Sequence, residues 1–341
     1  MPNLKNIIAE LKRNRISHRV EQPLAQFTTL GVGGNARLLI TARDCHTLEL
    51  TVRLAVANRV PFRVIGYGSN LIISDRGFDG LIILNRSRSW EIIGATKISK
   101  PMSITSRYNP IGEKSQVEAD DENPFPKKIV RVDSGFSNNA LIEEMFRQRL
   151  TGLEWFCGIP STVGGAVYMN MHGAHEYFGN LVHRAQLTDG FTTKIVDNAY
   201  FQFAYDFSIL QRTREIVLWV ELLLNDGNVE QARQKAKEWK LLKSQQPRRS
   251  AGCIFRNLSP EIQKKYNLPT SSIGYLIDKV LNLKGHRKGG AFISEKHAAF
   301  IENDGTAKAD DVYELVELIK AKARDALGLE LETEVEFVGK F

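Results

Sequence analysis

Two glycine-rich segments have the composition of ligand-binding loops. The first, residues 66–70, reads Gly-Tyr-Gly-Ser-Asn and follows the apolar pair Val64 and Ile65. Glycine lets the backbone approach a ligand closely, and successive N–H groups, with the side chains of Ser69 and Asn70, can hydrogen-bond phosphate oxygens. No third glycine opens a helix three residues on, so this segment is not the dinucleotide-binding fingerprint. A plain hairpin turn is the alternative interpretation.

The second glycine-rich segment, residues 157–170, reads Cys-Gly-Ile-Pro-Ser-Thr-Val-Gly-Gly-Ala-Val-Tyr-Met-Asn. Three glycines in an apolar setting suit a flat or extended cofactor laid against the backbone. A tight, buried loop that needs small residues for packing explains the same composition.

Cys253 is a candidate proton donor or nucleophile. It lies in residues 250–257, Ser-Ala-Gly-Cys-Ile-Phe-Arg-Asn, close to Arg248, Arg249 and Arg256. Positive neighbours would lower the pKa of the thiol, whereas burial would raise it, and a proton donor needs burial or a balance of the two. A lone cysteine is more often a small buried apolar residue.

A carboxylate near the C-terminus is the other candidate acid. Glu334 lies between Glu332 and Glu336 on one face of a predicted terminal strand. Three like charges on a strand face usually indicate a solvent-exposed face. If that face lines a cleft, mutual repulsion would raise the pKa of a carboxyl and make it useful as an acid. The histidines include no convincing third ligand beside His172 and His175, so no metal site is predicted.

Composition limits the class of protein that positions these residues. At 341 residues and about 150 residues per domain, the chain should form two or three domains. Three cysteines do not make a disulfide framework, and the N-terminus lacks the features of a secretory signal, so we expect a cytoplasmic protein without a membrane span. The net charge of +7 comes from scattered basic residues, which favours a phosphate-bearing small ligand over nucleic acid.

The periodicity predicts alternating helices and strands. A helix over 44–59, a strand–turn–strand over 61–74 and a strand at 80–85 indicate a small α/β unit. Beyond these elements, a loop-like insertion is predicted at 95–128, helices at 137–151, 229–243, 271–283 and 311–327, and strands at 128–135, 184–189, 215–224 and 329–338. We therefore divide the chain into 1–87, 88–224, 225–328 and a terminal strand segment, 329–341.

Taken in order, these segments resemble the UDP-N-acetylenolpyruvoylglucosamine reductase (UDP-N-acetylmuramate dehydrogenase) family, most closely its shorter subtype. The resemblance covers about residues 22–340. It rests on Phe-Thr-Thr-Leu-Gly-Val-Gly-Gly at 27–34, Gly-Tyr-Gly-Ser-Asn-Leu at 66–71, Ser-Asp at 74–75, Gly-Phe at 77–78, Gly-Leu-Glu at 152–154, Gly-Ile-Pro at 158–160, Gly-Gly-Ala-Val at 164–167, Met-Asn at 169–170, Ser-Ala-Gly-Cys at 250–253, Gly-Gly-Ala at 289–291, Ser-Glu-Lys-His-Ala at 294–298, and Leu-Glu with Glu-Val at 331–335.

The resemblance implies an α+β fold: a two-part FAD-binding domain of the vanillyl-alcohol-oxidase type (PCMH-like) and a C-terminal α+β substrate domain. The final strand would return toward the flavin and place Glu334 in the cleft. The implied FAD-binding residues are Gly66, Tyr67, Gly68, Ser69, Asn70, Leu71, Gly135, Gly158, Ile159, Pro160, Ser161, Gly164, Gly165 and Ala166.

The implied reaction has two halves. NADPH reduces FAD and leaves; the enolpyruvyl ether of UDP-N-acetylglucosamine then receives the hydride and a proton and becomes UDP-N-acetylmuramate for peptidoglycan synthesis. The family acid is a Ser or Cys at the position of Cys253, and Glu334 would polarise the enolate carboxylate. Asn257 and Arg256 would contact this sugar-nucleotide substrate, and we expect the enzyme to work as a monomer.

Some positions depart from the family pattern. In the family an arginine usually follows the tyrosine at position 205, and that arginine would bind the enolpyruvyl carboxylate; this chain has Asp206 there. In addition, Met171-His172 interrupts the usual Asn-Ala-Gly-Ala. Replacing the positive arginine by the negative Asp206 would turn an attraction for the substrate carboxylate of about 4 kcal/mol into an equal repulsion, at ~4 Å and an effective dielectric of about 20. A paralogue that reduces a related substrate, and a catalytically silent flavin-binding protein, are therefore the alternative functions.

Overall fold

The N-terminal sheet combines parallel and antiparallel strands. The structure is a computed structural model that describes residues 4–97, 126–174 and 176–341. In this sheet β5 (Phe78–Asn85) lies between β2 (Asn35–Ala42) and β3 (Phe62–Ile65), parallel to both, and β1 (His18–Pro23) is antiparallel to β2. The helices α1 (Leu4–Arg13) and α2 (Cys45–Ala57) pack on this sheet, where the buried side chains form one apolar cluster.

Helix α2 confirms the predicted helix and shows why it begins there. The carboxylate of Asp44 accepts a hydrogen bond from the backbone N–H of Thr47 at 2.7 Å, which satisfies one of the free donors of the first turn. Leu48 and Val52 are fully buried and attach the helix to the sheet.

The second sheet is antiparallel and carries the central part of the chain. Its strands run in the order β12-β11-β13-β7-β6, and the short β8 also pairs with β13. The bounds are β6 (Trp90–Thr96), β7 (Lys127–Asp133), β8 (Leu150–Thr151), β11 (Val182–Thr188), β12 (Thr193–Asp197) and β13 (Ile216–Asp226). Helices α3 (Asn138–Arg147), α4 (Val163–Met169) and α5 (Leu210–Thr213) and the small β9 (His172–Gly173) and β10 (Glu176–Tyr177) complete this part. Most of the predicted insertion, residues 98–125, lies outside the described residues.

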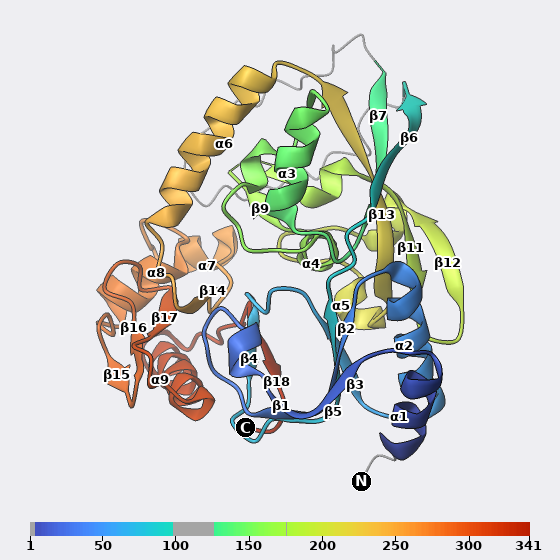
Figure 1. Cartoon of the computed structure of the whole chain (residues 1–341). Helices are drawn as coiled ribbons and strands as arrows, with labels where there is room; N and C mark the ends of the chain where they lie inside the picture. The colour runs from blue at the N-terminus through green and yellow to red at the C-terminus, as the bar shows by residue number, and fades with distance from the viewer. Residues whose placement is uncertain (1–3, 98–125, 175) are drawn as a thin grey trace.

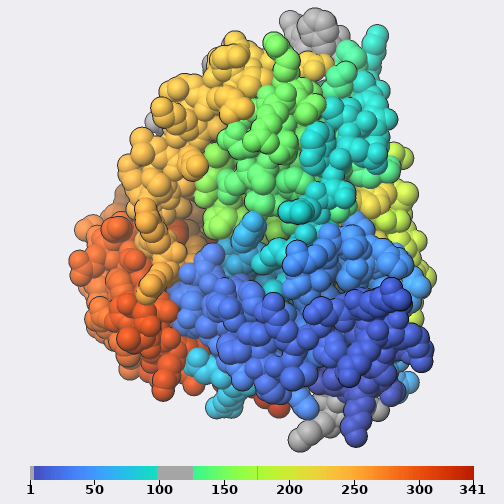
Figure 2. Space-filling view, in the orientation of Figure 1, coloured from blue at the N-terminus to red at the C-terminus, as the bar shows by residue number. Residues whose placement is uncertain are grey.

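Helix α6 (Val229–Ser244) leads from the second sheet to the third (Figure 1). The third sheet is antiparallel, with the order β14-β17-β16-β15, and its buried apolar cluster includes one face of α9. The bounds are β14 (Ser250–Cys253), α7 (Pro260–Lys265), α8 (Ile273–Tyr275), a π-helical turn (Leu276–Val280), β15 (Arg287–Lys288), β16 (Ala291–Ile293), β17 (Phe300–Asn303) and α9 (Ala309–Leu327). Figure 2 shows the C-terminal part, in orange and red, packed against the N-terminal part in blue.

The chain then returns to its N-terminal part. Strand β18 (Glu336–Val338) pairs in parallel with β4 (Leu71–Ile73), as Figure 1 shows. Because β4 pairs with β18 and β3 pairs with β5, the hairpin interpretation of residues 66–70 is wrong. The larger sheets lie within residues 18–85, 90–226 and 250–303, and the division into domains stays a prediction. In the described part of the chain, no helix is both long enough and apolar enough to cross a membrane.

Candidate active site

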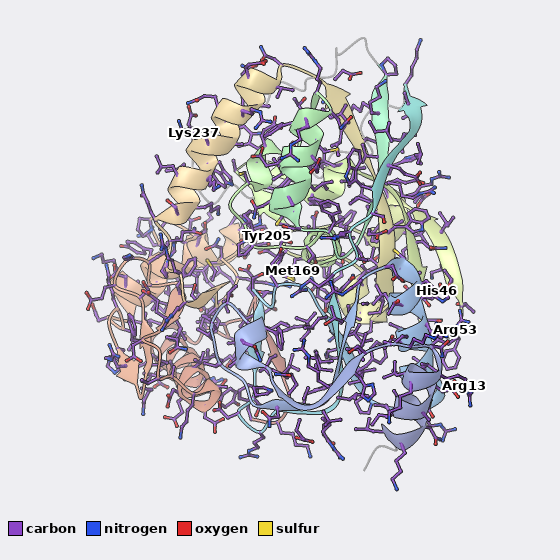
Figure 3. All side chains as sticks on the ribbon, in the orientation of Figure 1. Arg13, His46, Arg53, Met169, Tyr205 and Lys237 are labelled. Atoms are coloured by element: carbon purple, nitrogen blue, oxygen red, sulfur yellow. The ribbon has the colours of Figure 1, made fainter. Side chains whose placement is uncertain are left out.

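A cavity of about 770 Å³ is lined by residues from all three larger sheets and from the C-terminal segment. Figure 3 shows two of its lining residues, Met169 and Tyr205, near the centre of the molecule. The volume lies within the range of roughly 300–1,000 Å³ that is typical of small-molecule and cofactor sites. The cavity collects most of the residues singled out in the sequence: Gly66, Tyr67, Gly68, Ser69, Asn70, Leu71, Gly158, Ile159, Pro160, Ser161, Gly164, Gly165, Cys253, Asn257 and Glu334.

Three further predicted residues, Gly135, Ala166 and Arg256, are not among the residues that line this cavity. A Cβ atom on Gly135 would come within 2.3 Å of Oδ1 of Asn85, so this glycine permits close packing. Ala166 is fully buried in the apolar cluster of the second sheet. The guanidinium of Arg256 donates from Nη2 to the backbone carbonyl of Asp206 at 3.3 Å. The structure therefore gives the two small residues packing positions and leaves contact of Arg256 with substrate a prediction.

The first glycine-rich segment touches the second. Gly66 packs so closely that a Cβ atom would lie 2.6 Å from Oγ1 of Thr162, and the hydroxyl of Ser69 donates to the carbonyl of Pro160 at 2.7 Å. Gly68 has a φ of +63°, and a Cβ atom there would lie 2.2 Å from the carbonyl oxygen of Phe27. The hydroxyl proton of Ser69 is thus used inside the protein, which leaves the backbone N–H groups as the donors for a ligand.

The second glycine-rich segment is closely packed and also lines the cavity. Thr162 caps α4 by accepting a hydrogen bond from the N–H of Gly165 at 3.3 Å. Gly164 packs against Ser134, since a Cβ atom would come within 3.0 Å of the serine Cβ. Both glycines also line the cavity. Small residues here permit dense packing and at the same time keep the backbone open to a ligand.

Cys253 and Glu334 come from neighbouring backbone segments. Cys253 ends β14 and pairs with Phe300 of β17. The backbone N–H of Glu334 donates to the carbonyl of Ile254 at 2.9 Å. This contact brings the terminal segment alongside the cysteine segment, and both side chains line the same cavity.

The surroundings of these two groups favour their protonated forms. Burial raises the pKa of the Cys253 thiol, the charges of Glu334 and Asp206 raise it further, and Lys243 opposes the rise. Burial and then Asp206 raise the pKa of the Glu334 carboxyl well above its ordinary value of 4.5, against the opposing charges of Arg256 and Lys243. A thiol that keeps its proton at neutral pH can act as a proton donor.

Lys243 is a cavity residue that the sequence analysis missed. It lies in the last turn of α6, and its ammonium is 4.8 Å from the ring centroid of Trp239. Burial lowers the pKa of Lys243, and the charges of Cys253 and Glu334 oppose this effect. Among the described residues, no carboxylate lies within 4 Å of it. In the sequence it resembled any solvated lysine of a charged helix, and only the packing of α6 shows its position.

The three glutamates of the terminal segment have different surroundings. The Glu332 side chain is 80% exposed, whereas Glu334 and Glu336 line the cavity. Oε1 of Glu336 accepts hydrogen bonds from the hydroxyl of Tyr168 at 2.8 Å and from Nη1 of Arg214 at 2.5 Å. The interpretation of all three as one solvated strand face is therefore wrong, because β18 begins only at Glu336 and the preceding residues do not form a regular strand.

Tyr205 and Asp206 line the same cavity as the thiol. The amide of Asn257 donates to the hydroxyl of Tyr205 at 3.1 Å and accepts from the N–H of Ile273 at 3.0 Å. Asp206 is only 3% exposed, and its Oδ1 lies 3.0 Å from Nδ1 of His172. The two departures from the family pattern are therefore in direct contact.

The comparisons with known proteins agree along the whole chain. Residues 244–338 match the family model described as UDP-N-acetylenolpyruvoylglucosamine reductase, C-terminal domain. UDP-N-acetylenolpyruvoylglucosamine reductase 1 of a Bacillus cereus strain is 35% identical over 347 residues and covers 100% of both chains. The reductase of Anoxybacillus flavithermus is 34% identical over 337 residues, with 97% of each chain covered.

A solved structure extends this agreement to the fold. The UDP-N-acetylenolpyruvylglucosamine reductase of Thermus caldophilus superposes with a TM-score of 0.70 and 30% identity, over 95% of this chain and 99% of that chain. The mixed α+β architecture shared with this structure confirms the predicted fold class, and the relatives define the class of protein as an oxidoreductase. The chain belongs to the UDP-N-acetylenolpyruvoylglucosamine reductase family.

Proposed function

We propose that this chain is an FAD enzyme that uses NADPH to reduce the enolpyruvyl ether of UDP-N-acetylglucosamine to UDP-N-acetylmuramate. The observation that carries this proposal is that Cys253 and Glu334, two acids with raised pKa values, face one cavity with glycine-rich walls. The names of the relatives indicate the same reaction.

The residues at the cavity fit a flavin nucleotide. The segments 66–71, 158–161 and 164–165 would hold it, since their close-packed glycines leave the backbone open to a flat or extended ligand. When bound there, FAD supplies the hydride for the terminal vinyl carbon of the substrate. NADPH as the source of that hydride is part of the proposal.

Cys253 holds the proton that completes the reduction. After hydride arrives at the vinyl carbon, the S–H bond of Cys253 breaks and its proton joins the carbon that bears the ether oxygen. The product gains one hydride and one proton, and the thiolate regains a proton from solvent. Glu334, next to it, would hydrogen-bond the carboxylate in which negative charge develops.

Lys243 supports an anionic substrate. A half-buried ammonium without a carboxylate partner within the described structure favours a ligand that brings negative charge. Its position beside Cys253 would also stabilise the thiolate that remains after proton transfer. That the enzyme works as a monomer is part of the proposal.

The two half-reactions can be tested separately under anaerobic conditions. In the FAD-loaded protein, NADPH should bleach the flavin absorbance, and the enolpyruvyl ether should restore it. Cys253→Ala should keep the first step and lose the second, whereas Cys253→Ser should retain measurable turnover. Cys45→Ala is the matched control, because Cys45 lies on α2 and does not line the cavity. Normal turnover by Cys253→Ala would overturn the assignment of the acid.

The buried carboxylate of Asp206 favours one alternative, a paralogue that reduces a related substrate. In that case NADPH would still bleach the flavin, but the enolpyruvyl ether of UDP-N-acetylglucosamine would not restore its colour. A protein that binds flavin and cannot be bleached by NADPH would instead be a silent binding protein.

A further inference from the structure

His172, which is partly exposed, and the buried Asp206 form a pair in the wall of the cavity. Oδ1 of Asp206 lies 3.0 Å from Nδ1 of His172, and both residues line the cavity. Oδ2 of Asp206 is buried and has no hydrogen-bond partner among the described residues. A buried carboxylate oxygen without a partner is costly, so the pair is expected to serve a ligand or the reaction.

Hydrogen bonds to the backbone of Asp206 fix the position of this residue. Its φ of +48° is left-handed, and its carbonyl oxygen accepts hydrogen bonds from Nε2 of Gln211 at 2.9 Å and from Nη2 of Arg256 at 3.3 Å. The ring of His172 lies between two aromatic neighbours, with centroid distances of 5.4 Å to Tyr205 and 5.9 Å to Tyr177. Both members of the pair therefore have defined orientations.

This arrangement leaves Nε2 of His172 for a ligand. Nδ1 is occupied by Asp206, and within the described residues Nε2 makes no hydrogen bond. In the doubly protonated ring, Nδ1–H donates to Asp206 and Nε2–H is a charged donor for an anion.

The pair also lies where the reacting end of the substrate is proposed to bind. Asp206, Cys253 and Glu334 line the same cavity. A substrate carboxylate brought to this point needs a cation. Arg214 is already engaged by Glu336, and Arg256 is not part of the cavity lining. Lys243 does line the cavity, and the variants below compare it with His172.

We propose that His172, positioned by Asp206, binds the carboxylate of the enolpyruvyl group of the substrate. The inference rests on the proposed function for the identity of that substrate. His172 is the binding residue, and Asp206 is a positioning residue that acts through it. The substrate carboxylate would therefore contact the imidazole of His172, and the carboxylate of Asp206 would orient that imidazole.

Two ligands that differ only in the enolpyruvyl group test this assignment. The FAD-loaded protein is titrated with UDP-N-acetylglucosamine enolpyruvate and with UDP-N-acetylglucosamine, and the ratio of the two Kd values is measured by calorimetry. Wild type should prefer the enolpyruvyl ligand, and His172→Ala should reduce this preference at least about tenfold. The affinity for UDP-N-acetylglucosamine should stay unchanged, which a general loss of structure would not allow.

Further variants keep the test decisive if His172→Ala does not fold. His172→Gln retains a polar side chain without the charge and should lose most of the preference. Asp206→Asn should lose part of it, because asparagine tolerates the left-handed backbone and still accepts from Nδ1–H. His46→Ala, on the exposed face of α2 away from the cavity (Figure 3), is the matched control.

The outcomes separate this inference from the proposed function. Three results would overturn the assignment to His172. The wild-type protein could show no preference for the enolpyruvyl ligand, the preference could survive in His172→Ala and His172→Gln, or only Lys243→Met could remove it. Failure of the enolpyruvyl ether to reoxidise the reduced flavin would overturn the proposed function. A wild-type preference that depends on His172 would uphold the carboxylate site in that case as well.

Discussion

Asn70 and Glu334 are joined by a hydrogen bond in which Nδ2 of Asn70 donates to the backbone carbonyl of Glu334 at 3.0 Å. Nearby, the backbone N–H of Glu336 donates to the carbonyl of Asn70, also at 3.0 Å. The turn proposed to hold the cofactor therefore also positions the terminal segment that carries the candidate carboxyl. Asn70 therefore connects the turn proposed to bind the cofactor with the segment that positions Glu334.

Asn70→Ala should destabilise the protein and reduce turnover together. Loss of the amide donor leaves a half-buried carbonyl without its partner, at a cost of about 1–2 kcal/mol, and releases the backbone of Glu334. Thermal unfolding and steady-state kinetics measure the two effects. Asn14→Ala is the control, because Asn14 makes the same kind of bond to a carbonyl on an exposed helix end. An unchanged melting temperature and turnover for Asn70→Ala would contradict this role.

Glu334→Gln should change how stability depends on pH. The folded carboxyl has a raised pKa, so its contribution to stability is fully present below about pH 4.5 and is lost as the pH rises through the folded pKa. Glutamine has no proton to lose, so the variant should gain stability over wild type at pH 8 and show no such gain at pH 4.5, while its turnover falls. Melting temperatures at the two pH values test this. Glu332→Gln, at an exposed position on the same segment, should show no difference between the two pH values.

Cys253 should react slowly with iodoacetamide in the folded protein. Its raised pKa keeps the thiol protonated, and the thiolate is the form that reacts. Mass spectrometry of the peptide that contains Cys253 should show little alkylation at pH 8 and complete alkylation after unfolding in urea. Lys243→Met removes the charge that lowers this pKa and should slow the reaction further. Rapid alkylation of the folded wild type would show that the thiol is not the protonated group that the mechanism needs.

Gly68→Ala should cost more stability than Gly328→Ala, although both glycines have nearly the same φ angle. Their φ angles are +63° and +61°, and this left-handed conformation costs about 1–2 kcal/mol for alanine at either position. A Cβ atom on Gly328 meets nothing within 4 Å, whereas on Gly68 it would lie 2.2 Å from the carbonyl oxygen of Phe27. Melting temperatures and the Kd for FAD measure the outcome. Equal losses of stability and unchanged FAD affinity would show that close packing at Gly68 has no consequence.

Local sequence patterns determined much of what was found. The capping residue Asp44 and the apolar periodicity predicted α2, and charge and periodicity predicted α6 and α9. Glycine spacing indicated the two segments that line the cavity. These features depend on residues a few positions apart, so they are visible in the sequence and survive in the fold.

Only the tertiary structure decided which distant groups act together. Folding pairs β4 with β18, brings Lys243 into the same cavity as Cys253, and places His172 in contact with Asp206. Each of these relationships joins segments that no periodicity relates. The pKa of Glu334 likewise depends on burial and on charges from other segments. Sequence determined the chemical types of these groups, whereas folding set their distances and their exposure to solvent, and electrostatic effects depend on both.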